Sequence, residues 1–218
     1  MRLIFYSKWG IPKAKEIDLK FVNLLGDKSA KIGYISFNDE KHFYFDDFKK
    51  YYKRYDLKNF YCLDLKQANR NKLSILFRCK AIFLPGGNTF YFLRLLKRKK
   101  IMFSLKEYVD REGILVGMSA GAIIMTSNIR VANIPSFNPD KNQIGLKNLK
   151  GLNLVKFEFL PHFNKTKKYI NEVLNYSKKI KNPLYVCPNG SGIVVNNKKL
   201  TFVNKIFRFQ YGKFKEIN

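Results

Sequence analysis

Short apolar runs alternate with helical segments along the first half of the chain, and this alternation is the feature that most constrains the fold. The runs that predict buried strands are residues 3–6, 31–37, 59–65, 81–84 and 114–116. The segments with helical spacing of apolar residues are 14–25, 39–55, 73–77, 90–96 and 105–112. Strands that alternate with helices pair in parallel, with helices on both faces. The sequence therefore predicts an α/β fold with a mostly parallel central sheet.

The bulk composition is that of a globular protein. Of the 218 residues 46% are hydrophobic, and no repeat, low-complexity run or linker divides the chain. No apolar run approaches the roughly 18 residues that span a bilayer, and the N-terminus lacks the features of a signal peptide. We therefore expect a single domain over residues 1–218 in the cytoplasm, without membrane contact, as a monomer or a homodimer.

The three cysteines are Cys62, Cys79 and Cys187, which are far apart and outside any C-x-x-C pair. An odd number with this spacing indicates neither a disulfide framework nor a zinc site. We expect them to be small core residues, and we expect no metal and no cofactor.

The formal net charge of +26 raises the question of nucleic-acid binding, because cationic surfaces gain affinity by releasing counterions from phosphates. The basic residues are spread along the chain, however. Lysine, asparagine, isoleucine, phenylalanine and tyrosine are abundant together, as an AT-rich genome produces. Clusters such as residues 97–100 fit solvated helix ends. Charge alone supports a nucleic-acid partner, so we do not expect one. The positive electrostatic field of the protein does favour small anionic substrates.

The run Gly117-Met118-Ser119-Ala120-Gly121-Ala122 follows the apolar residues 114–116 and precedes a further apolar segment. This pattern predicts a buried strand, a sharp turn and the start of a helix, with Ser119 at the turn. Glycines on both sides permit the tight turn, and the free N–H groups of the helix point toward whatever Ser119 attacks. The motif indicates a nucleophile, with a chance match to G-x-S-x-G as the alternative.

A second glycine-containing turn, Pro85-Gly86-Gly87-Asn88-Thr89, follows the strand at 81–84. In a parallel sheet the loops at the carboxyl ends of strands converge on one crevice. We therefore expect Gly87 and Ser119 at the same edge, where the Gly87 N–H has no side chain to block it.

A serine nucleophile needs a base, and the chain contains two histidines. His42 lies in a polar helix and is expected at the surface. His162 follows an apolar strand at 157–160 and Pro161, which predicts a position at the same edge as Ser119. From position alone, a satisfied core histidine and a catalytic base are equally good interpretations of His162.

The two turns, together with Gly151-Leu152 and Pro161-His162-Phe163-Asn164, resemble the aspartyl dipeptidase (peptidase E) and cyanophycinase family of serine peptidases in order and spacing. The resemblance extends from the first strand to residues 192–195. It implies a flavodoxin-like three-layer sandwich related to class I glutamine amidotransferases, a cytoplasmic location, and no metal.

The resemblance also implies roles for individual residues. Ser119 is the expected nucleophile, His162 the general base, and the backbone N–H groups of Gly87 and Ala120 the oxyanion hole. The substrate is expected to be a small peptide. Further substrate contacts are expected from Gly86, Asn88 and Thr89.

The third position of the site departs from the family pattern. The family has Glu or Asp in a turn before a Gly-Ile-Val-Val strand, whereas this chain has Asn189 in Pro188-Asn189-Gly190. The asparagine oxygen can orient an imidazole but cannot stabilise an imidazolium by charge. An Asp→Asn change in a Ser-His-Asp site lowers turnover by about 10⁴. Asp140, in a loop expected to cap the site, and Glu158 are alternative acids outside the family position.

Three functions follow. The first is hydrolysis of small peptides through an acyl-enzyme on Ser119, slowed by Asn189. Cleavage after an N-terminal aspartate, as in peptidase E, would need a cation such as Lys165, Lys167 or Lys168. The second is a catalytically silent homologue that acts as a binding module. The third, supported by charge alone, is a nucleic-acid-associated protein.

Overall fold

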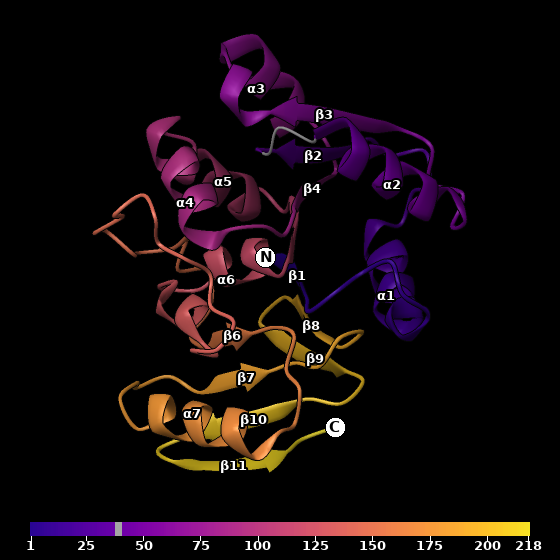
Figure 1. The fold of residues 1–218 in the computed structure, drawn as a ribbon. Helices are drawn as coiled ribbons and strands as arrows, with labels where there is room; N and C mark the ends of the chain where they lie inside the picture. The colour runs from indigo at the N-terminus through magenta and orange to yellow at the C-terminus, as the bar shows by residue number, and fades with distance from the viewer. Residues whose placement is uncertain (38–40) are drawn as a thin grey trace.

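A seven-stranded, mostly parallel sheet runs through the centre of the computed structural model, which describes residues 1–37 and 41–218 and the side chains outside 38–43 (Figure 1). Its order is β3-β2-β4-β5-β1-β8-β9, and β8 pairs antiparallel with both of its neighbours, β1 and β9. The bounds are β1 (Arg2–Tyr6), β2 (Ile32–Ser36), β3 (Phe60–Asp64), β4 (Ala81–Leu84), β5 (Ile114–Met118), β8 (Gly192–Asn196) and β9 (Lys199–Val203). The five strands predicted in the first half of the chain form the parallel part.

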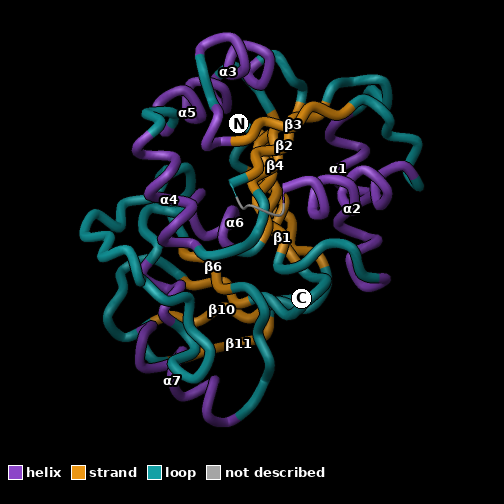
Figure 2. Tube along the Cα trace, turned by 45° about the horizontal axis from the view of Figure 1, so that its top comes forward, coloured by secondary structure: helices purple, strands orange, loops and turns teal. Residues whose placement is uncertain are grey.

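Helices cover both faces of this sheet, which Figure 2 shows nearly edge-on. Successive side chains of a strand point to opposite faces, so Ile4 and Tyr6 pack on one helical layer and Leu3 and Phe5 on the other. The first layer is α1 (Lys15–Leu25) and α2 (Lys41–Lys53); the second is α3 (Arg70–Phe77), α4 (Thr89–Arg98), α5 (Met102–Asp110) and α6 (Ala120–Met125). The predicted α/β sandwich is confirmed.

A second, four-stranded sheet lies beside the central one, in the order β11-β10-β7-β6. Its bounds are β6 (Glu158–Leu160), β7 (Leu184–Val186), β10 (Phe207–Gln210) and β11 (Lys213–Glu216), with α7 (Lys167–Ser177) packed against it. The strand predicted at 157–160 is β6, which belongs to this second sheet and not to the central one. β6 pairs with β7 in parallel, and His162 follows β6 by two residues. His162 therefore reaches the crevice from this second sheet.

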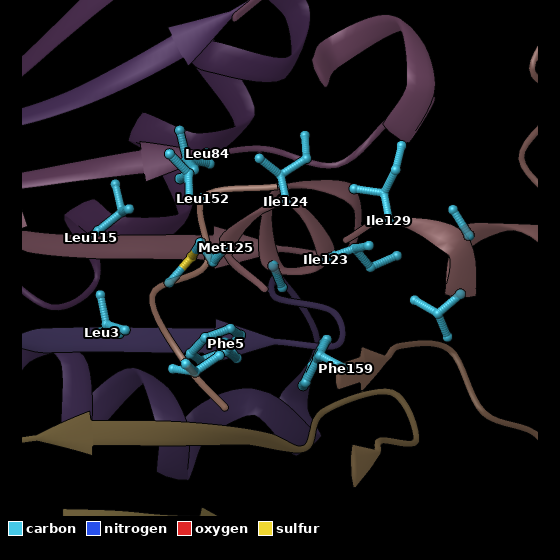
Figure 3. Packing of buried hydrophobic residues seen from close by; sticks show 14 of the residues in the cluster. Leu3, Phe5, Leu84, Leu115, Ile123, Ile124, Met125, Ile129, Leu152 and Phe159 are labelled. Carbon is cyan, nitrogen blue, oxygen red and sulfur yellow. The ribbon is translucent and has the colours of Figure 1, made fainter. Parts of the chain in front are cut away.

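Aromatic packing joins the two sheets. The ring of Phe5 on β1 lies 5.6 Å from the ring of Phe159 on β6 and 5.1 Å from that of Phe157, centroid to centroid. Figure 3 shows Phe5 and Phe159 next to each other, below the α6 residues Ile123 and Met125. All five side chains are buried. The second sheet is thus fixed against the central strand that also leads to the site.

Cys79 and Cys187 are buried, and Cys62 is partly buried. The helix predicted at 39–55 is α2, of which residues 39 and 40 lie outside the described part, as does the His42 side chain. In the ranges that the structure describes, no helix is long and apolar enough to cross a bilayer. The single domain over 1–218 stays a prediction.

Candidate active site

Ser119 lies between β5 and α6 in a backbone conformation that non-glycine residues rarely adopt. Its φ is 52° and its ψ is −114°, and such conformations cost of order 1–3 kcal/mol and persist only where the surroundings impose them. The Ser119 N–H donates to the Tyr6 carbonyl at 3.0 Å. A Cβ at Gly117 would lie 2.6 Å from the Ala122 nitrogen, and one at Gly121 would lie 2.1 Å from the Leu84 oxygen. The glycines therefore permit the close packing that holds Ser119 in this turn.

His162 meets Ser119 from the second sheet. The His162 Nε2 atom is 2.8 Å from Ser119 Oγ, and the Nδ1 atom is 2.7 Å from Asn189 Oδ1. Like Ser119, His162 has a positive φ, of 58°. The structure thus brings together the three residues for which the sequence predicted catalytic roles, in a continuous chain of hydrogen bonds.

The Asn189 contact decides which ring nitrogen of a neutral His162 carries the proton. A side-chain carbonyl oxygen can only accept, so Nδ1 must donate to Asn189 Oδ1. The Nε2 atom is then unprotonated and accepts from the Ser119 hydroxyl. This is the tautomer that a general base for Ser119 requires.

The surroundings of His162 favour its neutral form. Although the side chain is open to solvent on one side, loss of hydration around the ring lowers the pKa of the imidazole below its ordinary 6.5. The hydrogen bond to Asn189 raises the pKa, the nearby Lys8 lowers it, and Asp140 raises it. Desolvation is the largest of these effects, so the base is available at neutral pH.

Asn189 is held by the turn that follows β7. Gly190 has a φ of 87°, and a Cβ there would lie 2.5 Å from the Lys13 Cβ. The Gly190 carbonyl accepts from Asn204 Nδ2 at 2.8 Å, and Ser191 Oγ donates to the Pro188 carbonyl at 2.6 Å. The asparagine is therefore presented on a turn fixed from both sides.

The Gly86-Gly87 turn packs directly against the serine. A Cβ at Gly86 would meet Met118 Cε at 2.9 Å and Ser119 Cβ at 3.3 Å. Gly87 has a φ of 129°, and its N–H donates to no backbone carbonyl within residues 1–37 and 41–218. The Ala120 N–H, at the first position of α6, has no partner within the helix. Gly87 is exposed beside Ser119, whereas Ala120 is fully buried, and the oxyanion hole stays a prediction.

Asn88 and Thr89, predicted to contact substrate, anchor a loop instead of lining a cavity beside Ser119. Asn88 Oδ1 accepts from the Tyr91 N–H at 2.9 Å, and Asn88 Nδ2 donates to the Lys141 carbonyl at 3.0 Å. The N–H and the hydroxyl of Thr89 both donate to Asp140 Oδ2. Their contact with substrate stays a prediction.

The two alternative acids make their hydrogen bonds away from His162. Asp140 binds Thr89, as described above, and reaches His162 only through its electrostatic field. The buried Glu158 accepts from Tyr176 Oη at 2.5 Å and from Asn128 Nδ2 at 3.3 Å. Asn189 is therefore the group that contacts the Nδ1 atom of His162.

Two cavities flank the Ser119–His162 pair. The larger, of about 790 Å³, lies between the loop that includes Asp140 and the start of α7, where Lys168 lines it. The smaller, of about 380 Å³, has Trp9 and Tyr34 in its wall. Of the three lysines considered for substrate recognition, Lys168 alone lines the larger cavity. A peptide chain therefore has space on either side of Ser119.

Two residues at the end of β1 were not assigned to the site from the sequence. The Tyr6 carbonyl accepts from Ser119, and the Ser7 hydroxyl accepts from the His162 N–H at 2.8 Å. The sequence places Ser7 at the carboxyl end of a strand, but a single serine there matches no motif. No signal in the sequence identifies its contact with His162.

Comparison with known proteins gives one consistent result. The model of peptidase family S51 matches residues 6–203. An uncharacterised peptidase of Listeria monocytogenes is 34% identical over 120 residues, 55% of this chain and 58% of the relative, so the match covers less than two thirds of that protein. Peptidase E of a Nostoc species is 25% identical over 214 residues, 89% of this chain and 81% of the relative. A crystal structure of a candidate peptidase E from Listeria monocytogenes has a TM-score of 0.74 at 24% identity and covers 92% of this chain and 96% of that one.

Proposed function

The chain belongs to peptidase family S51, and from that premise we propose that it is a serine peptidase that hydrolyses small peptides. The observation that carries the proposal is the hydrogen-bonded series Ser119 Oγ, His162 and Asn189, with separations of 2.8 and 2.7 Å. Ser119 is the nucleophile and His162 the general base.

The reaction begins when Ser119 Oγ attacks the scissile carbonyl carbon and its proton passes to His162 Nε2. The tetrahedral intermediate then expels the amine, which takes the proton from Nε2, and leaves an acyl-enzyme on Ser119. Water attacks the acyl carbon with the same base and releases the acid. The positive φ of Ser119 presents Oγ to the cavities on either side.

The backbone N–H groups of Gly87 and Ala120 stabilise the oxyanion of the tetrahedral intermediate. The open donor at Gly87 and the helix terminus at Ala120 support this assignment. Each donor of this kind contributes roughly 2.7–4 kcal/mol to acyl transfer.

Asn189 orients His162 without supplying a negative charge. The imidazolium that forms during attack is therefore less stable than in a site with Asp or Glu, and turnover is slow. A catalytically silent homologue, which keeps the crevice to bind peptides, is the second candidate function. The retained Ser119–His162 hydrogen bond favours the enzyme.

A relative from Drosophila melanogaster is named a probable alpha-aspartyl dipeptidase, and that name supports a dipeptide substrate with an N-terminal aspartate. Lys168, in the wall of the larger cavity, is the cation proposed to bind its carboxylate, although its ammonium group also lies 5.0 Å from the centre of the Phe137 ring.

The test is hydrolysis of a dipeptide panel that includes Asp-X substrates, by the wild type, Ser119→Ala and Asn189→Asp. We expect slow turnover by the wild type that Ser119→Ala abolishes. Turnover by Asn189→Asp alone would support the silent homologue. The absence of serine-dependent hydrolysis in both forms contradicts the peptidase proposal.

A further inference from the structure

Ser7 directly follows β1, and its side chain is fully buried although it is polar. Its Oγ donates to the Cys187 carbonyl at 2.9 Å and accepts from the His162 N–H at 2.8 Å. The Ser7 N–H donates to the Ser191 carbonyl at 3.0 Å, which continues the pairing of β1 with β8. One hydroxyl thus connects the central sheet to the ends of β6 and β7.

Cys187, the acceptor of Ser7, belongs to the segment that carries Asn189. It follows β7 and comes two residues before Asn189 in the sequence. The Cys187 N–H donates to the Leu160 carbonyl at 2.8 Å, and its carbonyl also accepts from the Phe163 N–H at 3.1 Å. The loops that carry the base and its orienting amide are bound to each other here, and Ser7 binds both of them.

His162 depends on this support more than an ordinary loop residue does. Its φ of 58° is disfavoured for a residue with a Cβ, so the surrounding contacts must impose it. The hydrogen bond from the His162 N–H to Ser7 Oγ acts on the backbone of the strained residue itself. Without that acceptor, the backbone of His162, which carries the imidazole, loses one of the hydrogen bonds that restrain it.

The neighbouring residue of β1 holds the other half of the reacting pair. The Tyr6 carbonyl accepts from the Ser119 N–H at 3.0 Å, one residue before Ser7. Consecutive Cα atoms are about 3.8 Å apart in any trans peptide. Tyr6, the last residue of β1, and Ser7 directly after it therefore fix the backbones of nucleophile and base relative to each other.

We propose that Ser7 is a positioning residue of the active site, whose hydroxyl holds His162 at hydrogen-bond distance from Ser119. The inference rests on the proposed peptidase function for its catalytic consequence. Its structural content, the dependence of the Ser119–His162 contact on the Ser7 hydroxyl, does not require a substrate.

The experiment compares Ser7→Ala with a matched control, Ser177→Ala. Ser177 on α7 is also fully buried, donates to the Leu174 carbonyl at 2.8 Å and accepts from the Gly212 N–H at 3.0 Å. Each substitution removes one hydroxyl, so that one backbone N–H and one backbone carbonyl lose their hydrogen bond to it. Both variants should therefore lose thermal stability to a similar extent.

Activity separates the two variants. We expect Ser7→Ala to lower kcat by about 10–100-fold, because small displacements of a catalytic group have effects of that size, with a KM within about twofold of the wild type. The rate of fluorophosphonate labelling at Ser119 should fall in parallel. Ser7→Cys, which keeps a weaker donor and acceptor, should be intermediate, and Ser177→Ala should match the wild type.

Crystal structures of the wild type and Ser7→Ala complete the test. We expect the separation of Ser119 Oγ and His162 Nε2, 2.8 Å here, to exceed hydrogen-bond distance in the variant. An unchanged kcat, labelling rate and separation, with a lowered melting temperature, would reduce Ser7 to a structural residue and overturn the proposal. If the wild type hydrolyses no peptide, the peptidase function fails, and the measured separation still decides the role of Ser7.

Discussion

The two sheets supply the active site in different ways. The central sheet provides Ser119 and Gly87 from turns next to their own strands, where glycines and backbone contacts impose the conformation. The second sheet provides His162 and Asn189, 27 residues apart, from the ends of two short strands that pair with each other. The nucleophile is thus built by local geometry, and the base by the docking of one sheet on the other.

This difference between the sheets predicts that neither the nucleophile from the central sheet nor the base from the second sheet is active without the other. We expect Ser119→Ala and His162→Ala each to lower kcat by about 10², which is what remains of the about 10⁶ of a complete triad after the about 10⁴ lost with Asn189. We expect the double variant to be no worse, because the two groups act as one unit. Steady-state kinetics on the best dipeptide measures this. Ser104→Ala, on α5 and outside both flanking cavities, is the control. A double variant much slower than either single variant would mean that the two sheets contribute independently.

Among the residues that the second sheet supplies, Asn189 limits catalysis, because it orients His162 without a negative charge. We expect Asn189→Asp to raise kcat, by up to the about 10⁴ that separates Asp from Asn in a Ser-His-Asp site, because a carboxylate stabilises the imidazolium. The control is Asn197→Asp, which adds the same charge to the turn between β8 and β9. Equal activity of Asn189→Asp and the wild type would show that another group already supplies the charge.

The same contrast explains how much the sequence could predict. The strand-turn-helix at Ser119 leaves a local pattern of apolar run, glycine and small residues, so its position followed from the sequence. The second sheet leaves little pattern, because β6 and β7 have three residues each and are buried throughout. Their pairing depends on contacts between distant segments. The sequence therefore predicted His162 at the same edge as Ser119 but did not predict a separate sheet, and Ser7, a single serine without a motif, was not assigned a role.

Weakening the contact between the sheets should affect the base as well as the fold. We expect Phe159→Ala to lower the free energy of unfolding by about 3–5 kcal/mol. It should lower kcat as well, because Phe159 packs on Phe5 and comes three residues before His162 in the sequence. Phe92→Ala, which removes a buried ring stacked on Phe37, is the matched control.

Urea unfolding and kinetics on the folded protein distinguish the two variants. We expect a similar loss of stability in both, with kcat retained in Phe92→Ala. Equal retention of kcat in Phe159→Ala would mean that His162 does not depend on how the sheets dock.

The smallest expected effect is on the pH profile. His162 acts as a base only when neutral, so kcat/KM should fall as the pH drops through its pKa. Desolvation lowers that pKa below 6.5, so the acid limb should lie below pH 6.5. In Asn189→Asp the added charge should move the limb to higher pH. An acid limb above 6.5 in the wild type would contradict the neutral, desolvated base.

The most direct test of the account is the rate at which a fluorophosphonate modifies the protein, followed by intact mass. The account predicts one adduct on Ser119, no adduct in Ser119→Ala, and a rate about 10²–10⁴ lower in His162→Ala, the usual contribution of a general base. The absence of an adduct in the wild type, or labelling of His162→Ala at the wild-type rate, would contradict the claim that His162 from the second sheet activates Ser119 from the first.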